Sequence, residues 1–299
     1  MYTKVLVPLD GSKVGEQILP YARFFAETLK LPVEMMTVID FAAFAAHLPP
    51  GELRHLDTIV GGGIKNSKEY LQAAAQTFRG IDVQCAVETG KPGEVILEKA
   101  GSEATTLIAM ATHGRSGISR WLLGSIAEKV LRGGTNPLLL VHARENGEVS
   151  RKVALQSIIV PLDGSELAEQ VLPHVTALAK RMGLGIVLLR TYDIRQTIST
   201  YEDLLPEWEA LQAESKAEAT SYLDSILVEL QAQGLANVSR VVVYEAAAEQ
   251  IVKLATATPN SLIAMCTHGR SGVKRWALGS VTEKVVRHSA SPVLVVRAA

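Results

Sequence analysis

Residues 5–12 read Val-Leu-Val-Pro-Leu-Asp-Gly-Ser, and residues 158–165 read Ile-Ile-Val-Pro-Leu-Asp-Gly-Ser. A second pair of segments, 107–132 and 262–287, aligns without gaps and has 19 identical residues among 26 positions. A repeat of this length within 299 residues indicates a tandem duplication, because a single domain typically has about 100 to 150 residues.

Each copy has the pattern of an α/β domain, because short β-branched runs alternate with longer amphipathic stretches. The polar stretch 143–156 has the composition of a linker, and we therefore predict domains at 1–146 and 147–299. Near-continuous apolar runs are typical of strands covered by helices on both faces. These runs predict a five-stranded parallel sheet in each copy, with strands at 4–8, 33–38, 82–88, 106–110 and 138–141, and at 157–161, 185–191, 240–244, 261–265 and 293–296.

Between the second and third expected strands lie long insertions, 40–80 and 193–234, which differ greatly in sequence. We expect Pro49-Pro50-Gly51 and Gly61-Gly62-Gly63 to break the first insertion, whereas helix formers dominate the second. The last strand of each copy is an apolar edge, and antiparallel pairing of the two would hide both. We therefore predict an intramolecular pseudo-dimer, and further association into a homodimer of chains stays open.

The composition excludes several classes of protein. The chain has 30 basic and 31 acidic residues, so it lacks the excess of positive charge that nucleic-acid binding needs. No apolar stretch is long enough to span a membrane, and the amino terminus does not read as a signal peptide. Two cysteines, Cys85 and Cys266, and seven ungrouped histidines support neither disulfides nor a metal site. We expect a cytoplasmic protein that binds neither membrane nor nucleic acid.

The first strand of each copy ends at a candidate binding residue. Ligands of open parallel sheets bind at the carboxyl ends of strands, where the strand order reverses. Asp10 and Asp163 stand at such ends, each followed by Gly-Ser. A carboxylate there suits hydrogen bonds from ribose hydroxyls or an adenine amino group. An equally weighted alternative is a plain turn in which Ser12 caps the next helix.

The fourth strand of each copy leads into a second candidate element. The segment 111–114 reads Ala-Thr-His-Gly, and nine residues separate it from Gly124-Ser125. The second copy has Cys-Thr-His-Gly at 266–269, and nine residues again separate it from Gly279-Ser280. Glycine after a strand and Gly-Ser opening a helix are typical of phosphate binding, because backbone N–H groups and the helix dipole face the anion. Ser-x-x-Glu at 125–128 and 280–283 also fits a capping box, and the two roles are compatible.

The same loops contain histidine and tryptophan, for which we expect structural roles. His113 and His268 have no nucleophile or second carboxylate at motif spacing, so we expect them to fix the loops by hydrogen bonds instead of acting as general bases. Trp121 and Trp276 occupy equivalent positions in the nine-residue spacers, where we expect them to pack the loop onto the partner domain.

Taken together, these motifs resemble those of the universal stress protein family, in tandem form. The Val-Pro-Leu-Asp-Gly-Ser opening, the Thr-His-Gly-Arg segment, the nine-residue spacing to Gly-Ser and an apolar strand after a proline occur in this order in both halves. The resemblance implies Rossmann-like, adenine nucleotide alpha hydrolase-like domains and, in one subfamily, an ATP site, with any Mg²⁺ carried by the phosphates. Family members that bind ATP have glycine where this chain has Ala111 and Cys266. If that position serves a positive φ or a close approach of the backbone to a phosphate, alanine costs about 1 kcal/mol or more there.

Carried over position by position, the resemblance defines two nucleotide sites. The first consists of Pro8, Asp10, Val38, Met110, Ala111, Gly114, Arg115, Ser116, Gly124, Ser125 and Ile126. The second consists of Pro161, Asp163, Thr191, Gly269, Arg270, Gly279, Ser280 and Val281. We rank the first site above the second, because the second copy reads Glu-Ala-Ala-Ala at 245–248 where the first reads Gly-Lys-Pro-Gly at 90–93.

The expected function is a cytoplasmic stress-response protein that binds ATP or another adenine nucleotide and has a regulatory output. No residue is assigned a catalytic role, and we expect at most slow ATP hydrolysis. The alternative is a scaffold or interaction module of the same fold that acts through its divergent insertions. A hydride-transferring enzyme is set aside, because Gly-x-Gly-x-x-Gly is missing after the first strand.

Overall fold

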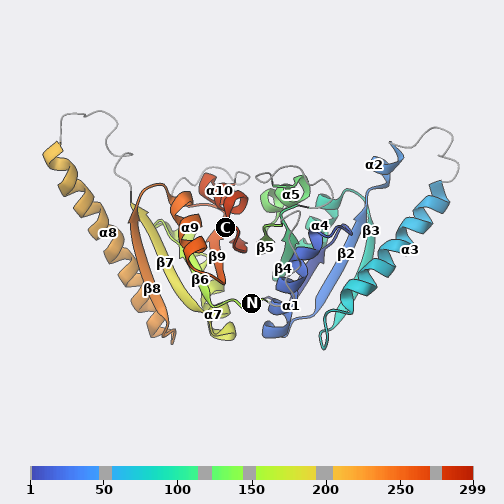
Figure 1. Cartoon of the computed structure of the whole chain (residues 1–299), viewed down its shortest axis with the longest axis horizontal. Coiled ribbons are helices and arrows are strands. Elements are labelled where there is room, and N and C mark those ends of the chain that lie inside the picture. Colours follow the sequence, from blue (N-terminus) through green and yellow to red (C-terminus); the bar gives the residue numbers. More distant parts are fainter. Residues whose placement is uncertain are drawn as a thin grey trace. The chain divides into compact units, whose positions relative to one another are not determined.

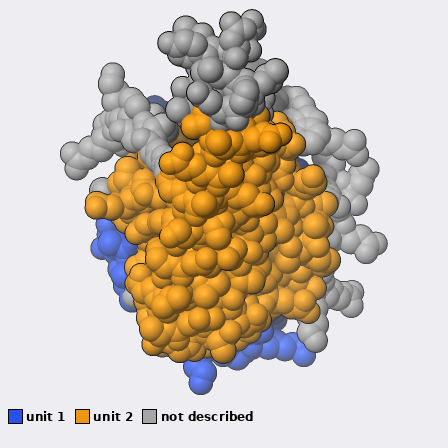
Figure 2. Space-filling view, turned by 90° about the vertical axis from the view of Figure 1, so that its left-hand side faces the viewer, with its two compact units in different colours: residues 1–153 blue, residues 154–299 orange. Residues whose placement is uncertain are grey.

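The computed structural model describes residues 2–46, 56–113, 123–143, 153–192, 205–269 and 278–298 (Figure 1). The chain divides into two compact units, Met1–Val153 and Ala154–Ala299, which Figure 2 colours separately. The predicted boundary between residues 146 and 147 falls outside the described residues and stays a prediction.

Unit 1 is built on a five-stranded parallel sheet in the order β3-β2-β1-β4-β5. Its strands are β1 (Lys4–Pro8), β2 (Val33–Ile39), β3 (Val83–Thr89), β4 (Thr106–Ala111) and β5 (Leu138–Val141). Its helices are the 3₁₀ turn η1 (Gly15–Ile18), α1 (Leu19–Leu29), α2 (Phe41–Ala45), α3 (Leu56–Ala75), α4 (Pro92–Gly101) and α5 (Ser125–Gly133).

Unit 2 repeats this topology with the strand order β8-β7-β6-β9-β10. Its strands are β6 (Ser157–Pro161), β7 (Gly185–Tyr192), β8 (Val238–Tyr244), β9 (Ser261–Cys266) and β10 (Val293–Val296). Its helices are α6 (Glu166–Glu169), α7 (Leu172–Met182), α8 (Leu205–Ala232), α9 (Ala247–Ala257) and α10 (Ser280–His288).

The helices cover both faces of each sheet (Figure 1). Right-handed crossovers place α1 and α3 on one face of unit 1, and α4 and α5 on the other, because the chain changes direction across the sheet after β3. In agreement, α4 packs against α5, and α3 packs against β2 and β3. Every residue of the central strand β4 is buried, as is every residue of β9. The strand orders place the reversal of direction between β1 and β4 in unit 1 and between β6 and β9 in unit 2.

The predicted fold class is confirmed, and all ten strands occur where the sequence places them. No strand end differs from its expected position by more than two residues. The predicted break at Gly61-Gly62-Gly63 is wrong, because α3 continues through all three glycines. Pro49-Pro50-Gly51 lies outside the described residues. Pairing of 138–141 with 293–296 stays a prediction. Among the described residues, no helix is both long and apolar enough to cross a membrane.

Candidate functional site

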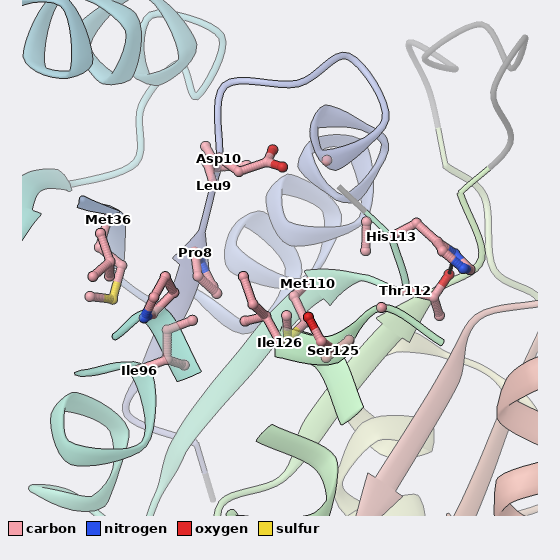
Figure 3. A pocket seen from close by; sticks show the side chains of 16 residues that line it. Pro8, Leu9, Asp10, Met36, Ile96, Met110, Thr112, His113, Ser125 and Ile126 are labelled. Carbon is pink, nitrogen blue, oxygen red and sulfur yellow. Dashed lines mark hydrogen bonds between the residues drawn. The ribbon is translucent and has the colours of Figure 1, made fainter. Parts of the chain in front are cut away.

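A cavity of about 390 Å³ opens at the carboxyl ends of β1, β2 and β4 in unit 1 (Figure 3). The first turns of α4 and α5 complete its wall. Every residue of the predicted first site that the structure describes lines it: Pro8, Asp10, Val38, Met110, Ala111, Gly124, Ser125 and Ile126. The remaining three, Gly114, Arg115 and Ser116, lie outside the described residues. The structure thus brings together segments that are more than a hundred residues apart in the sequence.

One side of the cavity is an apolar slot. Met36 of β2 and Ile96 of α4 are both buried, and Pro8 lies close to them (Figure 3). Pro92, in the first turn of α4, also lines the cavity. The sequence analysis did not assign Met36, Pro92 or Ile96 to the site. The strand pattern could have suggested Met36, because it lies two residues before Val38 and therefore on the same face of β2.

The backbone of Val38 presents a donor and an acceptor beyond the end of β1. Alternate residues of β2 turn their N–H and C=O groups toward β1. The last β1 contact is the hydrogen bond from the Leu9 N–H to the Met36 carbonyl (2.8 Å), and the register ends with Pro8 opposite Met36. Val38 lies two residues further along and has the same orientation as Met36, so its polar groups face the cavity past the last registered residue of β1.

The amino terminus of α5 forms the opposite wall. The helix N-cap is Gly124, which has no side chain to cap the helix, and its own N–H donates to the Thr112 carbonyl (2.8 Å). The predicted capping box is wrong, because Ser125 is already inside the helix and the Glu128 carboxylate pairs with Arg132 (2.9 Å). The N–H groups of residues 125–127 therefore have no side-chain cap, and the positive end of the helix dipole is directed at the cavity.

Gly124 is required at this position by packing. An added Cβ would lie 2.9 Å from the Thr112 carbonyl oxygen, closer than side chains tolerate. Gly279 has the same relation to Thr267 in unit 2, at 2.7 Å. Glycine therefore allows the start of α5 to approach the strand that precedes it, and this approach positions the helix N–H groups at the cavity wall.

Asp10 lies at the edge of the cavity, and one of its carboxylate oxygens is engaged in a turn. Asp10 Oδ1 accepts hydrogen bonds from the Ser12 N–H (3.0 Å) and from Ser12 Oγ (2.7 Å). Ser12 Oγ in turn accepts from the Gly15 N–H (2.9 Å). The plain-turn alternative is therefore present in the geometry, although the residue at the N-cap of η1 is Val14 and not Ser12. Asp10 combines this turn with a place in the cavity lining.

Ala111 and Cys266 are ordinary strand residues. Ala111 pairs with Val141 and Cys266 with Val296 in parallel ladders. Among the described non-glycine residues, positive φ occurs at Lys30, Glu245 and Asn260 alone. The expectation of backbone strain at the missing glycine is therefore wrong: neither alanine nor cysteine violates a φ requirement there.

The extra volume of the Cys266 side chain is accommodated by packing. The thiol is buried, and the backbone of Val171 lies close to it. Val171 occupies the repeat position of Ile18 in unit 1, so the smaller neighbour accompanies the larger strand residue. Burial raises the pKa of the Cys266 thiol to about 12, and the thiol is therefore uncharged at neutral pH.

His113 lines the cavity and is held by its neighbour. Its Nδ1 lies 3.0 Å from Thr112 Oγ1, and that hydroxyl accepts a hydrogen bond from the Ala143 N–H (3.4 Å). The ring of His142 meets the His113 ring edge-on at 6.1 Å between centroids. Within the described ranges, no cluster of three or more metal-ligating side chains occurs. Trp121 and Trp276 lie outside those ranges.

The second predicted site has the same backbone frame. The Leu162 N–H donates to the Leu189 carbonyl (2.9 Å), so Thr191 takes the orientation of Val38. The N-cap of helix α10 is also a glycine, Gly279, so this helix has no side-chain cap either. All predicted residues of this site are described except Arg270. The carboxylate of Asp163, however, packs directly against Gly269, where an added Cβ would lie 2.0 Å from Oδ2.

The loops at residues 90–93 and 245–248 differ in sequence and share one backbone feature. Gly90 has a φ of 136°, and Glu245, at the same place in unit 2, has a φ of 115°. Glu245 in unit 2 thus has the positive φ of Gly90, although it is not a glycine. Gly93 is also closely packed, because an added Cβ would lie 2.8 Å from Lys129 Cδ.

The family model of the universal stress protein family matches residues 1–142 and again residues 154–297. The chain belongs to the universal stress protein family. A tandem relative, a universal stress protein of Mycolicibacterium smegmatis, is 23% identical over 304 residues, which cover 98% of this chain and 96% of that protein. The expected membership and the tandem form are therefore both confirmed.

Solved structures extend the likeness to the fold of the whole chain. A universal stress protein from Archaeoglobus fulgidus DSM 4304 is 20% identical with a TM-score of 0.69 and covers 99% of this chain and 98% of its own. A universal stress protein solved in complex with cAMP is 21% identical with a TM-score of 0.34 and covers 49% of this chain and 99% of its own.

Proposed function

We propose that unit 1 binds an adenine nucleotide, with ATP as the first candidate, and that the protein is a cytoplasmic stress-response protein with a regulatory output. One observation carries the proposal. The 390 Å³ cavity combines an apolar slot, a backbone donor and acceptor at Val38, and the uncapped amino terminus of α5. These are the three surfaces that a flat heterocycle with a polar edge and an attached phosphate require.

Each part of the ligand has a matching surface. The base lies in the slot of Met36 and Ile96 and turns its polar edge to the backbone of Val38. The phosphates lie at the amino terminus of α5, where backbone N–H groups and the helix dipole stabilise negative charge. Asp10 stands between these regions and accepts hydrogen bonds from the sugar. Any Mg²⁺ enters with the phosphates, which supply its oxygen ligands.

The regulatory output is supported by how the titratable groups of the lining are held. Asp10 Oδ1 accepts two hydrogen bonds from Ser12, and His113 Nδ1 lies against Thr112. Catalysis of hydrolysis requires a group that orients an attacking water, and these two side chains are instead fixed to their own loops. The scaffold alternative depended on Ala111 and Cys266, and both residues fit their strands without strain.

The test is nucleotide release from the purified protein by acid denaturation, with identification by mass spectrometry, followed by calorimetric titration with ATP and Mg²⁺. We expect about one equivalent per chain and thermal stabilisation of about 2.7 kcal/mol at a hundredfold excess over Kd. Asp10→Ala and Gly124→Ala weaken binding. Asp82→Ala is the matched control, because this exposed carboxylate precedes β3 at the opposite end of the sheet.

The binding measurements distinguish a nucleotide-binding protein from an interaction module. Loss of binding in Asp10→Ala and Gly124→Ala with retention in Asp82→Ala supports the site. Absence of nucleotide together with absence of thermal stabilisation by ATP and Mg²⁺ rejects the proposal and favours the interaction module. Adenosine is titrated in parallel, and equal affinity for adenosine and ATP contradicts the phosphate role of α5.

A further inference from the structure

In unit 2 the carboxylate of Asp163 joins two loops that follow neighbouring strands. Asp163 Oδ1 accepts hydrogen bonds from the Ser165 N–H (3.0 Å) and from Ser165 Oγ (2.6 Å), both in the turn after β6. Its other oxygen, Oδ2, packs on Gly269 in the segment after β9. The fit there is close, because an added Cβ would lie 2.0 Å from Oδ2 and 2.9 Å from Cγ of the carboxylate. One oxygen thus accepts hydrogen bonds from the turn after β6, and the other lies against the backbone of Gly269.

The turn that carries Asp163 is braced from the other side. Ser165 Oγ accepts a hydrogen bond from the Ala168 N–H (3.2 Å) and caps α6. In α6, Glu169 accepts a hydrogen bond from Tyr222 Oη (2.8 Å), which belongs to α8. The guanidinium of Arg190, buried on β7, stacks on the Tyr222 ring at 4.7 Å from its centroid. The turn is therefore fixed to α8 as well as to the strand.

In unit 1 the repeat counterpart of Tyr222 is also a tyrosine, Tyr70, but other parts of the bracing differ. Glu16 occupies the repeat position of Glu169 and pairs with Lys13 of its own turn (2.9 Å). Thr37 occupies the repeat position of Arg190. The two Asp-Gly-Ser turns therefore have the same sequence and different surroundings.

We propose that Asp163 is a positioning residue that holds Gly269 against the turn after β6 and thereby closes the second predicted site to nucleotide. This inference rests on the proposed function only in what it says of nucleotide. The contact of Asp163, Ser165 and Gly269 is called the Asp163 latch below. Because Oδ1 of Asp163 is hydrogen bonded within its turn and Oδ2 lies against Gly269, a ligand that contacts this carboxylate has to displace Gly269 or break the turn. In unit 1, Asp10 lines the cavity, and Gly114, the repeat counterpart of Gly269, lies outside the described residues.

The latch can be tested without nucleotide, by the reactivity of a buried thiol. Cys266 is 5% exposed, and the charge of Asp163 lies close enough to influence it. Cys85 is exposed, so it is replaced by serine to leave Cys266 as the only thiol. The measurement is the rate at which a thiol reagent labels folded protein. We expect Asp163→Ala and Gly269→Ala each to raise this rate by about tenfold or more, because opening of the latch uncovers the thiol.

Two variants distinguish opening from an electrostatic effect on the thiol. Asp163→Ala also removes a negative charge that raises the pKa of Cys266. Gly269→Ala keeps this charge and acts only through the added methyl group. An unchanged labelling rate in Gly269→Ala overturns the latch, as does an equal increase in the control Asp82→Ala. Asp163→Asn keeps the size of the side chain and serves where Asp163→Ala does not fold.

A double-mutant cycle tests the contact itself. Gly269→Ala alone lowers the thermal midpoint of unit 2 by about 5 °C or more, because the methyl group collides with the carboxylate. Removing the carboxylate removes the collision, so the double variant Asp163→Ala/Gly269→Ala recovers most of this loss. Additive midpoint shifts overturn the proposal.

Nucleotide titration then separates the two proposals. Asp163→Ala leaves the bound nucleotide undiminished if Asp163 is a positioning residue. Loss of a nucleotide equivalent in this variant makes Asp163 a ligand contact and overturns the latch, whereas absence of nucleotide from the wild-type protein rejects only the proposed function. The labelling rates and the cycle remain decisive in either case.

Discussion

Replacement of Glu245 by glycine is expected to stabilise unit 2. Glu245 has a φ of 115°, in the region that favours glycine, and Gly90 holds the same place in unit 1 with a φ of 136°. The side chain of Glu245 is exposed and accepts a hydrogen bond from Gln250, which is half-buried. The substitution therefore removes backbone strain and gives up one solvent-exposed contact.

The magnitude follows from three contributions. A non-glycine residue in a sparsely populated region of φ and ψ costs about 1 to 3 kcal/mol. Glycine also lowers the free energy of unfolding by about 0.4 to 1 kcal/mol, because it makes the unfolded chain more flexible. The exposed hydrogen bond contributes about 0.5 kcal/mol. The net expectation is a stabilisation of about 1 kcal/mol, which corresponds to an increase of about 2 to 4 °C in the Tm of a unit of this size.

The assay is urea unfolding followed by circular dichroism, with hydrogen exchange to assign each transition to unit 1 or unit 2. Glu245→Ala is the matched control, because alanine loses the side-chain contact and keeps the strained φ. It is expected to be neutral or destabilising. If Glu245→Ala stabilises unit 2 as much as Glu245→Gly does, the effect comes from the side chain, and the reasoning from φ is refuted.

Two other predictions concern unit 1. Gly61→Ala and Gly62→Ala are each expected to stabilise α3 by about 1 kcal/mol, because nothing lies within 4 Å of an added Cβ at either position; slower hydrogen exchange in α3 is the check. Glu34 is partly buried, which raises its pKa, but hydrogen bonds from Lys99 and Lys4 prevail and lower it below the usual range. Glu34 therefore stabilises unit 1 above its unfolded pKa, and this contribution is lost as pH falls through the folded pKa. Urea unfolding between pH 3 and 7 should show a weaker pH dependence in Glu34→Gln.

The fold could be predicted from the sequence because its signals are local and repeated. The apolar runs mark all ten strands, and their order along the chain leaves a parallel sheet as the simple solution. The first site could be predicted for the same reason, since the ends of neighbouring parallel strands meet at one edge of the sheet. Met36 and Ile96 escaped the analysis because they carry no motif and reach the cavity only through packing.

The errors of the sequence analysis have a common physical origin in close backbone packing. Ser125 and Glu128 have the spacing of a capping box, which would need Ser125 at the N-cap. In the structure the N-cap is Gly124, which packs against the Thr112 carbonyl, so Ser125 is already the first residue of the helix. Likewise, a motif pattern places glycine at position 111 without saying which φ it needs, and the strand ladder shows that alanine satisfies the position. Spacing alone does not contain these distances.

The two copies show why retained motif residues need not mean a retained site. Asp163, Gly269 and Gly279 are all present in unit 2, and the backbone frame around them matches that of unit 1. The differences around the Asp163 latch lie outside the motif, in Arg190, which replaces Thr37, and in the partner of Glu169, which is Tyr222 where Glu16 has Lys13. If the latch holds, a nucleotide site is closed although its aspartate and both of these glycines are kept, and contacts of the insertion helix brace the turn that carries the aspartate. Counting motifs would then overestimate the number of ligands per chain, because the two carboxylates make the same turn contacts and the packing around Asp163 decides between one and two.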